Sequence, residues 1–490
     1  IMSLTIEEQI ELLNQQINDL KDLQEETITA SNDMWLILCG VFVFLMQAGF
    51  ALLEAGSVRQ KNVANILFKN IIDAAITALC WWWLGFGFAF GETKGRFIGT
   101  SYFGLNDKDF KSTNENDIND LKFPFFFFEW AFAAASATIV SGALAERCRV
   151  EAYFTYTIVA STFIYPIIAH WCWGEGWLSA FGTNPSKFLF YGTRSNNYID
   201  FAGSGVVHMV GGFSALVGAK LIGPRKGRFD EKDKKIINPI EGHNVAYTVL
   251  GTILLWVGWY GFNSGSTLAI VGHSKLAGKI AVNTTISAAA SGCACVLFSK
   301  IIDKFDMSTI CNAILAGLVG VTAGCAVVDP WGAFIIGVAS CAVYMITAKI
   351  ILEILRIDDP VEASALHGCT GFWGVIAVGI FGNDENAKFA GYYGSSHGHH
   401  PFKSGEQFGL QIVAALCILV WTLLTAGIAF LLINKYIKLR AEEADEEHGL
   451  DRKLQVKKPY GRDGPPTADY HSVNPRPTAI AAEEMNPEQL

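Results

Sequence analysis

Two stretches of this chain, DFAGSGVVH at residues 200–208 and DPVEASALH at residues 359–367, decide its fold. In each stretch an aspartate precedes a histidine by eight residues, and a glycine-rich segment follows the histidine. The two copies lie five apolar runs apart, so the helices that carry them are expected to cross a membrane in opposite directions. Such an arrangement is typical of an inverted repeat, which places a binding site near the bilayer midplane.

Long apolar runs surround both stretches. A helix needs about 20 apolar residues to cross the hydrocarbon core of a bilayer, and closely packed membrane helices are often rich in Gly and Ala, as several of these runs are. We therefore predict an all-α polytopic membrane protein with about eleven spanning helices and an inverted repeat of five plus five. The predicted spans are 34–53, 71–90, 123–144, 153–173, 202–222, 245–266, 280–302, 310–328, 331–352, 364–381 and 408–433.

The composition agrees with a lipid-embedded chain and argues against several other classes. Hydrophobic residues make up 51% of the 490 residues and charged residues only 17%, whereas soluble domains carry roughly 25% charged residues. No basic face or arm stands out, so we expect no nucleic-acid partner. The eleven cysteines lie mostly in apolar runs and form no Cys-x-x-Cys pair, which argues against a disulfide framework or a zinc site.

The basic residues predict the orientation in the membrane. Lys and Arg gather in alternate short loops, for example at Arg59 and Lys61, at Arg147 and Arg149, and at residues 220–235. The positive-inside rule places these loops in the cytoplasm. With an odd number of spans, the N-terminus then lies outside and the C-terminus inside. We expect a multi-pass protein of the plasma membrane.

The two ends differ from the apolar centre. At the N-terminus, apolar residues recur at spacings of four and three, at Ile6, Ile10, Leu13, Ile17 and Leu20. This spacing predicts an amphipathic helix over residues 1–33, extracellular by the orientation above, which forms either a short coiled coil or a helix packed on the membrane domain. Residues 34–439 then form the membrane domain. Residues 440–490 are expected to form a cytosolic tail, largely disordered because it becomes polar and Pro-rich.

The two repeated histidines suggest the chemistry. Ionisable residues inside membrane spans are costly and are functional candidates by default. Eight residues of helix rise about 12 Å, so Asp200 and Asp359 lie near the membrane faces, where each can cap a helix N-terminus. His208 and His367 then lie about halfway across. A neutral imidazole donates and accepts hydrogen bonds, so the pair can pass a small polar molecule or relay a proton. Two histidines alone make a poor metal site, and we expect no metal and no cofactor.

Several motifs in order now point to a family. They are GFALLEAGSVR at 49–59 with Lys61-Asn62, SGALAER at 141–147, DFAGSGVVHM at 200–209 and WYGFNSGS at 259–266. From about Met34 to Asp451 the chain resembles the ammonium transporter, methylammonium permease and Rhesus family, and within it the ammonium transporter branch. The resemblance implies eleven helices with helices one to five inverted against six to ten. It also implies a homotrimer in the lipid bilayer with one pore per subunit, and ammonium or ammonia, with methylammonium, as substrate.

The resemblance also implies roles for residues along the pore. His208 and His367 match the twin pore histidines of the family. Phe132, in FEWAFA at 128–133, and Phe262 match its two gate phenylalanines.

Three further matches lie toward the outer side. Trp173, in HWCWG at 170–174, matches the vestibule tryptophan that contributes a cation–π contact, and Ser266 matches the serine that accepts a hydrogen bond from the cation. Asp200 matches an aspartate needed for transport. The implied function is transport in which ammonium is recruited and deprotonated at an outer vestibule and ammonia passes a hydrophobic pore.

Two other transport-related functions stay open, and an enzyme is disfavoured. In an ammonium sensor, binding would shift the cytosolic tail, although no receiver or kinase-like domain follows Arg440. A Rhesus-type neutral gas channel is the other alternative, against which the complete cation site with Trp173 and Ser266 argues. No nucleophile–base pair, phosphate loop or cofactor motif stands out, so we expect no enzymatic activity.

Overall fold

The computed structural model describes residues 5–93, 95–111, 122–179, 198–233, 235–301, 305–392 and 401–454. Over these residues the regular structure is helical, with isolated β-bridges and no β-strand. Ten helical segments are long and apolar enough to cross a membrane. The predicted all-α multi-span membrane fold is therefore confirmed, while the count of eleven spans, the inverted repeat and the sidedness stay predictions.

The helices follow the predicted spans in order. The first half contains α1 (Ile6–Ser57), α2 (Val63–Cys80), α3 (Phe86–Phe90), α4 (Phe123–Ala143), α5 (Val150–Val159), α6 (Tyr165–Cys172) and α7 (Val210–Ile222). The second half contains α8 (Val245–Gly265), α9 (Ser274–Ile301), α10 (Met307–Thr322), α11 (Pro330–Lys349), α12 (Thr370–Phe381), α13 (Asp384–Phe389), α14 (Pro401–Ser404), α15 (Glu406–Tyr436) and α16 (Glu443–His448). Single π-helical turns join α2 to α3 and α5 to α6, so each of these pairs forms one span.

Helix α10 is shorter than its predicted span of 310–328. It has 16 residues and ends at Thr322, although the sequence stays apolar to Val328. Hydrogen bonds from other segments explain the early end: Ser204 Oγ accepts from the Ala323 backbone N–H at 2.7 Å, and Asn283 Nδ2 donates to the Val328 carbonyl at 3.0 Å. The backbone after Thr322 therefore bonds to its neighbours instead of continuing the helix.

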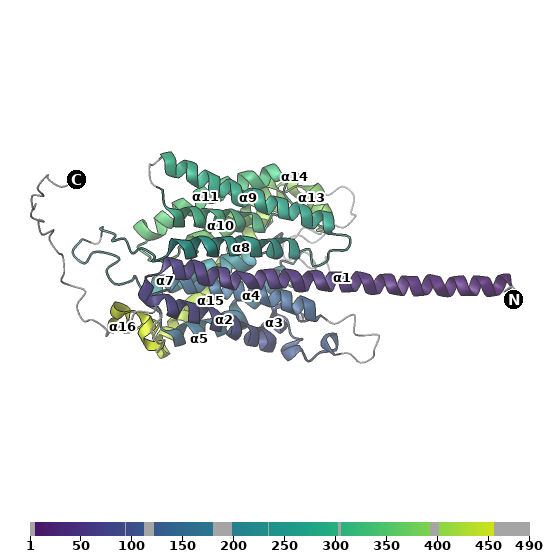
Figure 1. Ribbon diagram of the computed structural model, residues 1–490, viewed down its shortest axis with the longest axis horizontal. Coiled ribbons are helices and arrows are strands. Elements are labelled where there is room, and N and C mark those ends of the chain that lie inside the picture. The colour runs from purple at the N-terminus through teal and green to yellow at the C-terminus, as the bar shows by residue number, and fades with distance from the viewer. Residues whose placement is uncertain are drawn as a thin grey trace, which may run out of the picture. The chain divides into compact units, whose positions relative to one another are not determined.

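Helix α1 is one uninterrupted helix of 52 residues. It starts at a capping box in which Thr5 and Glu8 exchange hydrogen bonds. Its N-terminal part projects away from the other helices (Figure 1), and residues 5–27 are exposed. The predicted boundary between residues 33 and 34 thus falls inside a continuous helix. Residues 5–27 therefore do not pack on their own chain's bundle, and the coiled coil stays a prediction.

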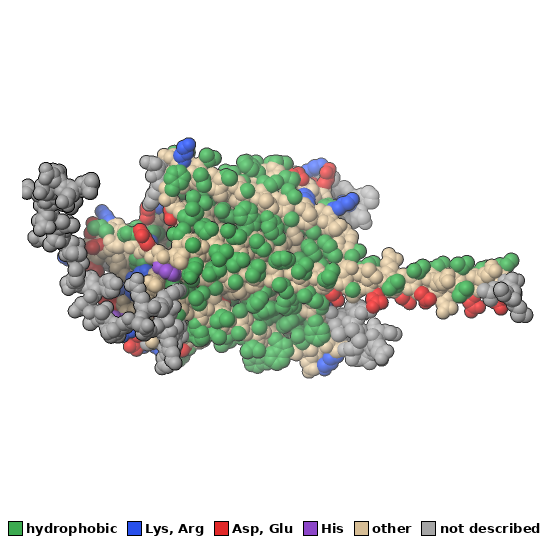
Figure 2. All heavy atoms as spheres, viewed as in Figure 1, with side chains coloured by type: hydrophobic (Ala, Val, Ile, Leu, Met, Phe, Trp, Pro, Cys, Tyr) green, Lys and Arg blue, Asp and Glu red, His purple; other side chains and the backbone are tan. Residues whose placement is uncertain are grey.

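Close backbone approaches hold the bundle together. Helix α1 packs against α8 and α4. A Cβ atom added at Gly251 of α8 would lie 2.4 Å from the Leu53 backbone nitrogen of α1, so only glycine fits there. Small residues at helix contacts allow this kind of packing in membranes. On the face of the bundle that Figure 2 shows, hydrophobic side chains cover the middle and charged side chains lie nearer the two ends.

The basic loops meet at one end of the bundle, as the orientation argument requires. Arg59 pairs with Glu146, and Arg225 donates to both carboxylate oxygens of Asp358 at 2.8 and 2.9 Å. Burial alone raises the pKa of Asp358, but the hydrogen bonds and charge of Arg225 outweigh it and lower this pKa from 3.8 to about 2. The cytoplasmic location of this end stays a prediction from the positive-inside rule.

The start of the tail packs on the same end. Arg440 binds the Glu446 carboxylate at 2.8 Å. Asp451 accepts hydrogen bonds from the Ala64 and Asn65 backbone N–H groups at 3.1 and 2.7 Å, and so caps the N-terminus of α2. Residues 440–454 are therefore bound to the bundle, and the predicted disorder of the remaining tail falls on residues outside the described part.

Candidate functional site

The two repeated histidines lie side by side in the interior of the bundle. His208 belongs to the π-helical turn Ser204–Met209 that begins α7, and His367 belongs to the π-helical turn Ser364–Cys369 that begins α12. The two Nδ1 atoms are 3.2 Å apart, and the rings are nearly parallel at 16°. The two residues are 0% and 3% exposed. Segments 159 residues apart in the chain thus form one buried imidazole pair.

Each histidine-bearing turn begins at its aspartate. Asp200 accepts hydrogen bonds from the backbone N–H groups of Gly203, Gly205 and Val206 at 2.9, 2.8 and 2.9 Å. Asp359 accepts from the backbone N–H of Ser364 at 2.8 Å. Both carboxylates satisfy backbone donors that have no partner at a helix start. The capping role predicted from the Asp-x7-His spacing is therefore present in both copies.

A backbone contact fixes the distance between the two turns. A Cβ atom added at Gly212, four residues after His208, would lie 2.0 Å from the backbone nitrogen of Gly368. No side chain fits between these two segments. The glycines that follow the histidines therefore allow α7 and the His367 turn to approach closely enough for the imidazoles to share a hydrogen bond.

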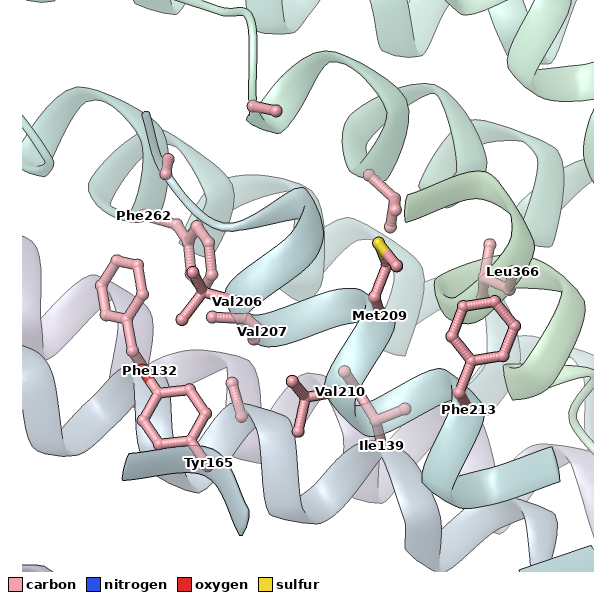
Figure 3. Close-up of a cluster of buried hydrophobic side chains, with 14 of the residues drawn as sticks. Phe132, Ile139, Tyr165, Val206, Val207, Met209, Val210, Phe213, Phe262 and Leu366 are labelled. Atoms are coloured by element: carbon pink, nitrogen blue, oxygen red, sulfur yellow. The ribbon is translucent and has the colours of Figure 1, made fainter. Parts of the chain in front are cut away.

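Two phenylalanines from different helices cover His208. The rings of Phe132 (α4) and Phe262 (α8) are stacked at 4.0 Å, and Phe262 lies 5.6 Å from the His208 ring. Figure 3 shows the two phenylalanines facing each other beside Val206 and Val207 of the His208 turn. Both phenylalanines are at most 1% exposed. Through Phe262, the stacked rings therefore lie next to the histidine pair.

A small cavity of about 80 Å³ lies on the other side of Phe132. Phe132, Trp173, Ser266 and Glu129 are among the residues that line it. The Trp173 ring meets Phe132 edge-on at 5.9 Å, and its Nε1 donates to the Asp200 carbonyl at 2.7 Å. The aromatic face of Trp173 is thus held in place by the residue that caps the His208 turn.

Ser266 contributes a free acceptor to this cavity. Its hydroxyl donates to the Phe262 carbonyl at 2.9 Å. Because the hydroxyl hydrogen is engaged, the oxygen lone pairs stay available to accept a hydrogen bond. Aromatic faces and a hydroxyl acceptor together suit a small cation with N–H donors.

A second, larger cavity of about 440 Å³ lies toward the end with the basic loops. Its lining includes Ala365, two residues before His367, together with Asn312, Asp359 and Arg225. The line from the small cavity through the phenylalanines and histidines therefore leads toward a polar cavity at the other end.

Six of the seven residues singled out in the sequence lie along this line and Asp200 supports it from beside, but sequence reasoning missed others. Glu129 lines the small cavity, and His170 in α6 is buried with its Nδ1 2.8 Å from the Ala89 carbonyl. Both are ionisable residues inside predicted spans, and by that feature alone the sequence marks them as candidate functional residues. Within the described part of the chain, no group of three His, Cys, Asp or Glu residues could hold a metal ion.

Comparison with known proteins shows what the chain as a whole is similar to. A profile of the Ammonium Transporter Family matches residues 34–458. "Ammonium transporter 1 member 3" of Solanum lycopersicum is 40% identical over 450 residues, covering 87% of this chain and 92% of the relative. "Ammonium transporter Amt2" of Archaeoglobus fulgidus is 38% identical over 444 residues, covering 89% of each chain.

Solved structures show the same fold. A "Sensor Amt Protein" matches with a TM-score of 0.78 and 33% identity, covering 88% of this chain and 100% of that one. Mep2 of Candida albicans matches with a TM-score of 0.71 and 27% identity, covering 85% of this chain and 87% of that one.

Proposed function

This chain belongs to the Ammonium Transporter Family, and from that premise we propose that it captures ammonium in an outer vestibule, removes its proton there and passes ammonia along the paired histidines. It is a transporter and not an enzyme. The observation that carries the proposed route is the buried imidazole pair, with Nδ1 atoms 3.2 Å apart, behind two stacked phenylalanines.

The small cavity is the proposed capture site. A cation there meets the faces of Trp173 and Phe132, and its N–H groups can donate to Ser266, whose own hydrogen is bound to Phe262. Cation–π attraction is strongest where water is excluded. Asp200 supports the site through its carbonyl, which fixes the Trp173 ring.

The phenylalanine pair favours loss of the proton before passage. Phe132 and Phe262 are buried and stacked, so they offer no hydrogen-bond acceptor to an ion between them. Transferring a bare ion into such surroundings costs far more than transferring a neutral polar molecule. Ammonia can therefore pass where ammonium, Na⁺ and K⁺ are excluded. The proton either crosses by a separate route, which gives net charge transport, or returns to the outer side.

The histidine pair then stabilises the neutral molecule. In the Nδ1–Nδ1 hydrogen bond one imidazole donates and the other accepts. With both rings neutral, the pair therefore has one donor and one acceptor left on its two Nε2 atoms. His208 Nε2 is buried and has no partner among the described residues. Ammonia, with one lone pair and three N–H groups, can bond to either end in turn.

Three further features belong to the proposal: a homotrimer with one pore per subunit, a plasma-membrane location, and methylammonium as a second substrate. They follow from the family resemblance.

Uptake of labelled methylammonium by cells that lack their own ammonium transport tests the proposal. Uptake should saturate, and unlabelled ammonium should compete for it while Na⁺ and K⁺ should not. Exchange of Phe262 for alanine should change uptake, whereas Phe334→Ala, at a 54% exposed position of α11, should leave it unchanged. No uptake by cells that display the wild-type chain would contradict the proposal.

A sensor is the second candidate function. One structural neighbour is titled "Sensor Amt Protein", and residues 440–454 of this chain are bound to the bundle by Asp451 and Arg440. Ammonium binding in the same cavity would then change how these residues pack. Methylammonium uptake in the assay above would favour the transporter. Ammonium binding without any uptake would favour the sensor.

A further inference from the structure

Glu129 is a buried carboxylate that the route above does not use. It lies in α4 and is 5% exposed. No described residue donates a hydrogen bond to its Oε2 atom, which is itself buried. An isolated buried carboxylate is costly and usually finds a cation or a hydrogen-bond donor. The fold therefore keeps an acceptor at this position without giving it a partner from the described part of the chain.

The carboxylate lines the proposed capture site. Glu129 contributes to the same cavity of about 80 Å³ as Trp173 and Ser266, and it precedes Phe132 by about one helical turn. Among the described residues that line the cavity, it is the only charged one. A water molecule occupies about 30 Å³ in the liquid, so the cavity has room for an ion of ammonium's size.

We propose that Glu129 binds the ammonium ion directly, as an anionic hydrogen-bond acceptor in the capture site. This inference rests on the proposed function and adds a residue to it. The ion donates one N–H to Glu129 and one to Ser266, and it faces the rings of Trp173 and Phe132. Hydrogen bonds between charged partners are shorter and stronger than neutral ones. The cation supplies the partner that Glu129 lacks.

The isosteric exchange Glu129→Gln tests this role. Glutamine keeps the size and an oxygen acceptor but removes the charge. Loss of a hydrogen bond to a charged group lowers affinity by about tenfold or more. The ammonium concentration that half-saturates methylammonium uptake or current should therefore rise by about tenfold or more. Glu92→Gln is the matched control, because it removes the same charge from an exposed position just after α3.

Two further results make the test decisive. Glu129→Asp keeps the charge but withdraws it by one methylene, and its half-saturating concentration should lie between those of wild type and Glu129→Gln. If Glu129→Gln does not reach the surface, the Asp variant alone carries the comparison with wild type. If variants that reach the cell surface have a half-saturating ammonium concentration within twofold of the wild-type value, the role of Glu129 is overturned while the transport function stands. No transport by wild type refutes the function itself.

A separate feature, the projecting part of α1, carries a second inference. Ile6, Ile10, Leu13, Ile17 and Leu20 are 75%, 53%, 55%, 48% and 64% exposed. Figure 2 shows hydrophobic side chains along one edge of this segment and acidic side chains along the other. The same heptad positions continue into the membrane-spanning part, where Met34, Leu38 and Val41 are 66%, 49% and 50% exposed. On these positions, which form one seam, α1 is apolar from Ile6 to Leu20 and again from Met34 to Val41, with the polar residues Gln24, Thr27 and Ser31 between the two parts.

The charges beside the seam fit a second copy of the same helix. If Ile10 and Ile17 occupy heptad position a, most acidic residues fall on outer positions, among them Glu8, Glu11, Asp19, Asp22, Glu25 and Glu26. The flanking g and e positions of parallel copies would then pair Gln9 with Asn14, Gln16 with Lys21, and Leu23 with Ile28. None of these pairs brings like charges together. Copies in one membrane are parallel, because each α1 continues into a span of the same direction.

We infer that the N-terminal parts of α1 from neighbouring copies of this chain form a parallel coiled coil. Cysteine cross-linking in membranes tests it: Ile17→Cys should form oxidised cross-links between full-length chains. Leu12→Cys should not, since Leu12 is equally exposed at 47% but lies off the seam. Cross-linking that is equal at the two positions, or that is absent at Ile17, overturns the inference. Adding Ile10→Glu to the Ile17→Cys chain should reduce the cross-links at least severalfold.

Discussion

Exchange of Gly212 for alanine should separate the two histidine-bearing turns. The added methyl would lie 2.0 Å from the Gly368 backbone nitrogen and 2.5 Å from its Cα. Carbon atoms in contact need about 3.5 Å, so the segments must move apart by about 1.5 Å. No rotamer change can relieve a contact with backbone. Overpacking typically costs about 1–3 kcal/mol, and we expect at least the upper end here.

The displacement should also abolish the imidazole pair. The Nδ1 atoms are now 3.2 Å apart, and a further separation of about 1 Å exceeds the range of a hydrogen bond. Gly212→Ala should therefore melt several degrees below wild type in detergent and take up methylammonium more than tenfold more slowly. Gly427→Ala in α15 is the control, because its methyl would meet only Val217 Cγ1 at 3.9 Å. Wild-type melting and uptake in Gly212→Ala would refute the role assigned to this contact.

Three further predictions concern the carboxylates. Asp200→Asn places an NH₂ group against backbone N–H donors that bind a carboxylate in the wild type. The free energy of unfolding should fall by about 2 kcal/mol, and methylammonium uptake should fall with it. A wild-type melting temperature in this variant would contradict the capping role. The pKa of Asp358 is lowered from 3.8 to about 2, so the ionised carboxylate contributes roughly 2 kcal/mol to the free energy of unfolding above pH 4, and this contribution is lost as the pH falls toward 2. Between pH 5 and 2 the melting temperature should therefore fall more steeply for wild type than for Asp358→Asn. Parallel curves of melting temperature against pH would exclude this linkage. Asp451→Ala removes the cap of α2, which costs about 1 kcal/mol, and should speed hydrogen exchange of residues 443–454. Glu443→Ala is the control, because it breaks only an exposed ion pair with Lys226 and should leave this exchange unchanged. Equal exchange rates in the two variants would speak against the cap.

The sequence predicted the helices and the histidine pair for identifiable reasons. Apolar runs of about 20 residues leave few alternatives in a membrane, and the repeated Asp-x7-His spacing placed His208 and His367 at equivalent depths. The capping bonds of Asp200 and Asp359 followed from the same spacing. What the spacing could not predict is the π-helical form of both turns, because that depends on how the turns pack against other helices.

Other differences arise from contacts between distant residues. The apolar sequence continues past Thr322, but Ser204 and Asn283 bind the backbone beyond it and end α10. Glu129 was visible as a lone carboxylate in an aromatic span, yet only the structure shows that it lines the cavity. The continuity of α1 was predictable, since no Gly or Pro occurs from Ile6 to Cys39 to end the helix.

The most direct test combines electrical current with labelled methylammonium uptake, in cells that display the wild-type chain or His208→Ala. Saturable, ammonium-dependent uptake by wild type, abolished or altered in ion selectivity in His208→Ala, is the predicted result. Current that accompanies the uptake would show that the proton also crosses, and uptake without current would show that ammonia crosses alone. Unchanged rate and selectivity in His208→Ala, or neither current nor uptake by displayed wild type, would contradict transport along the histidine pair.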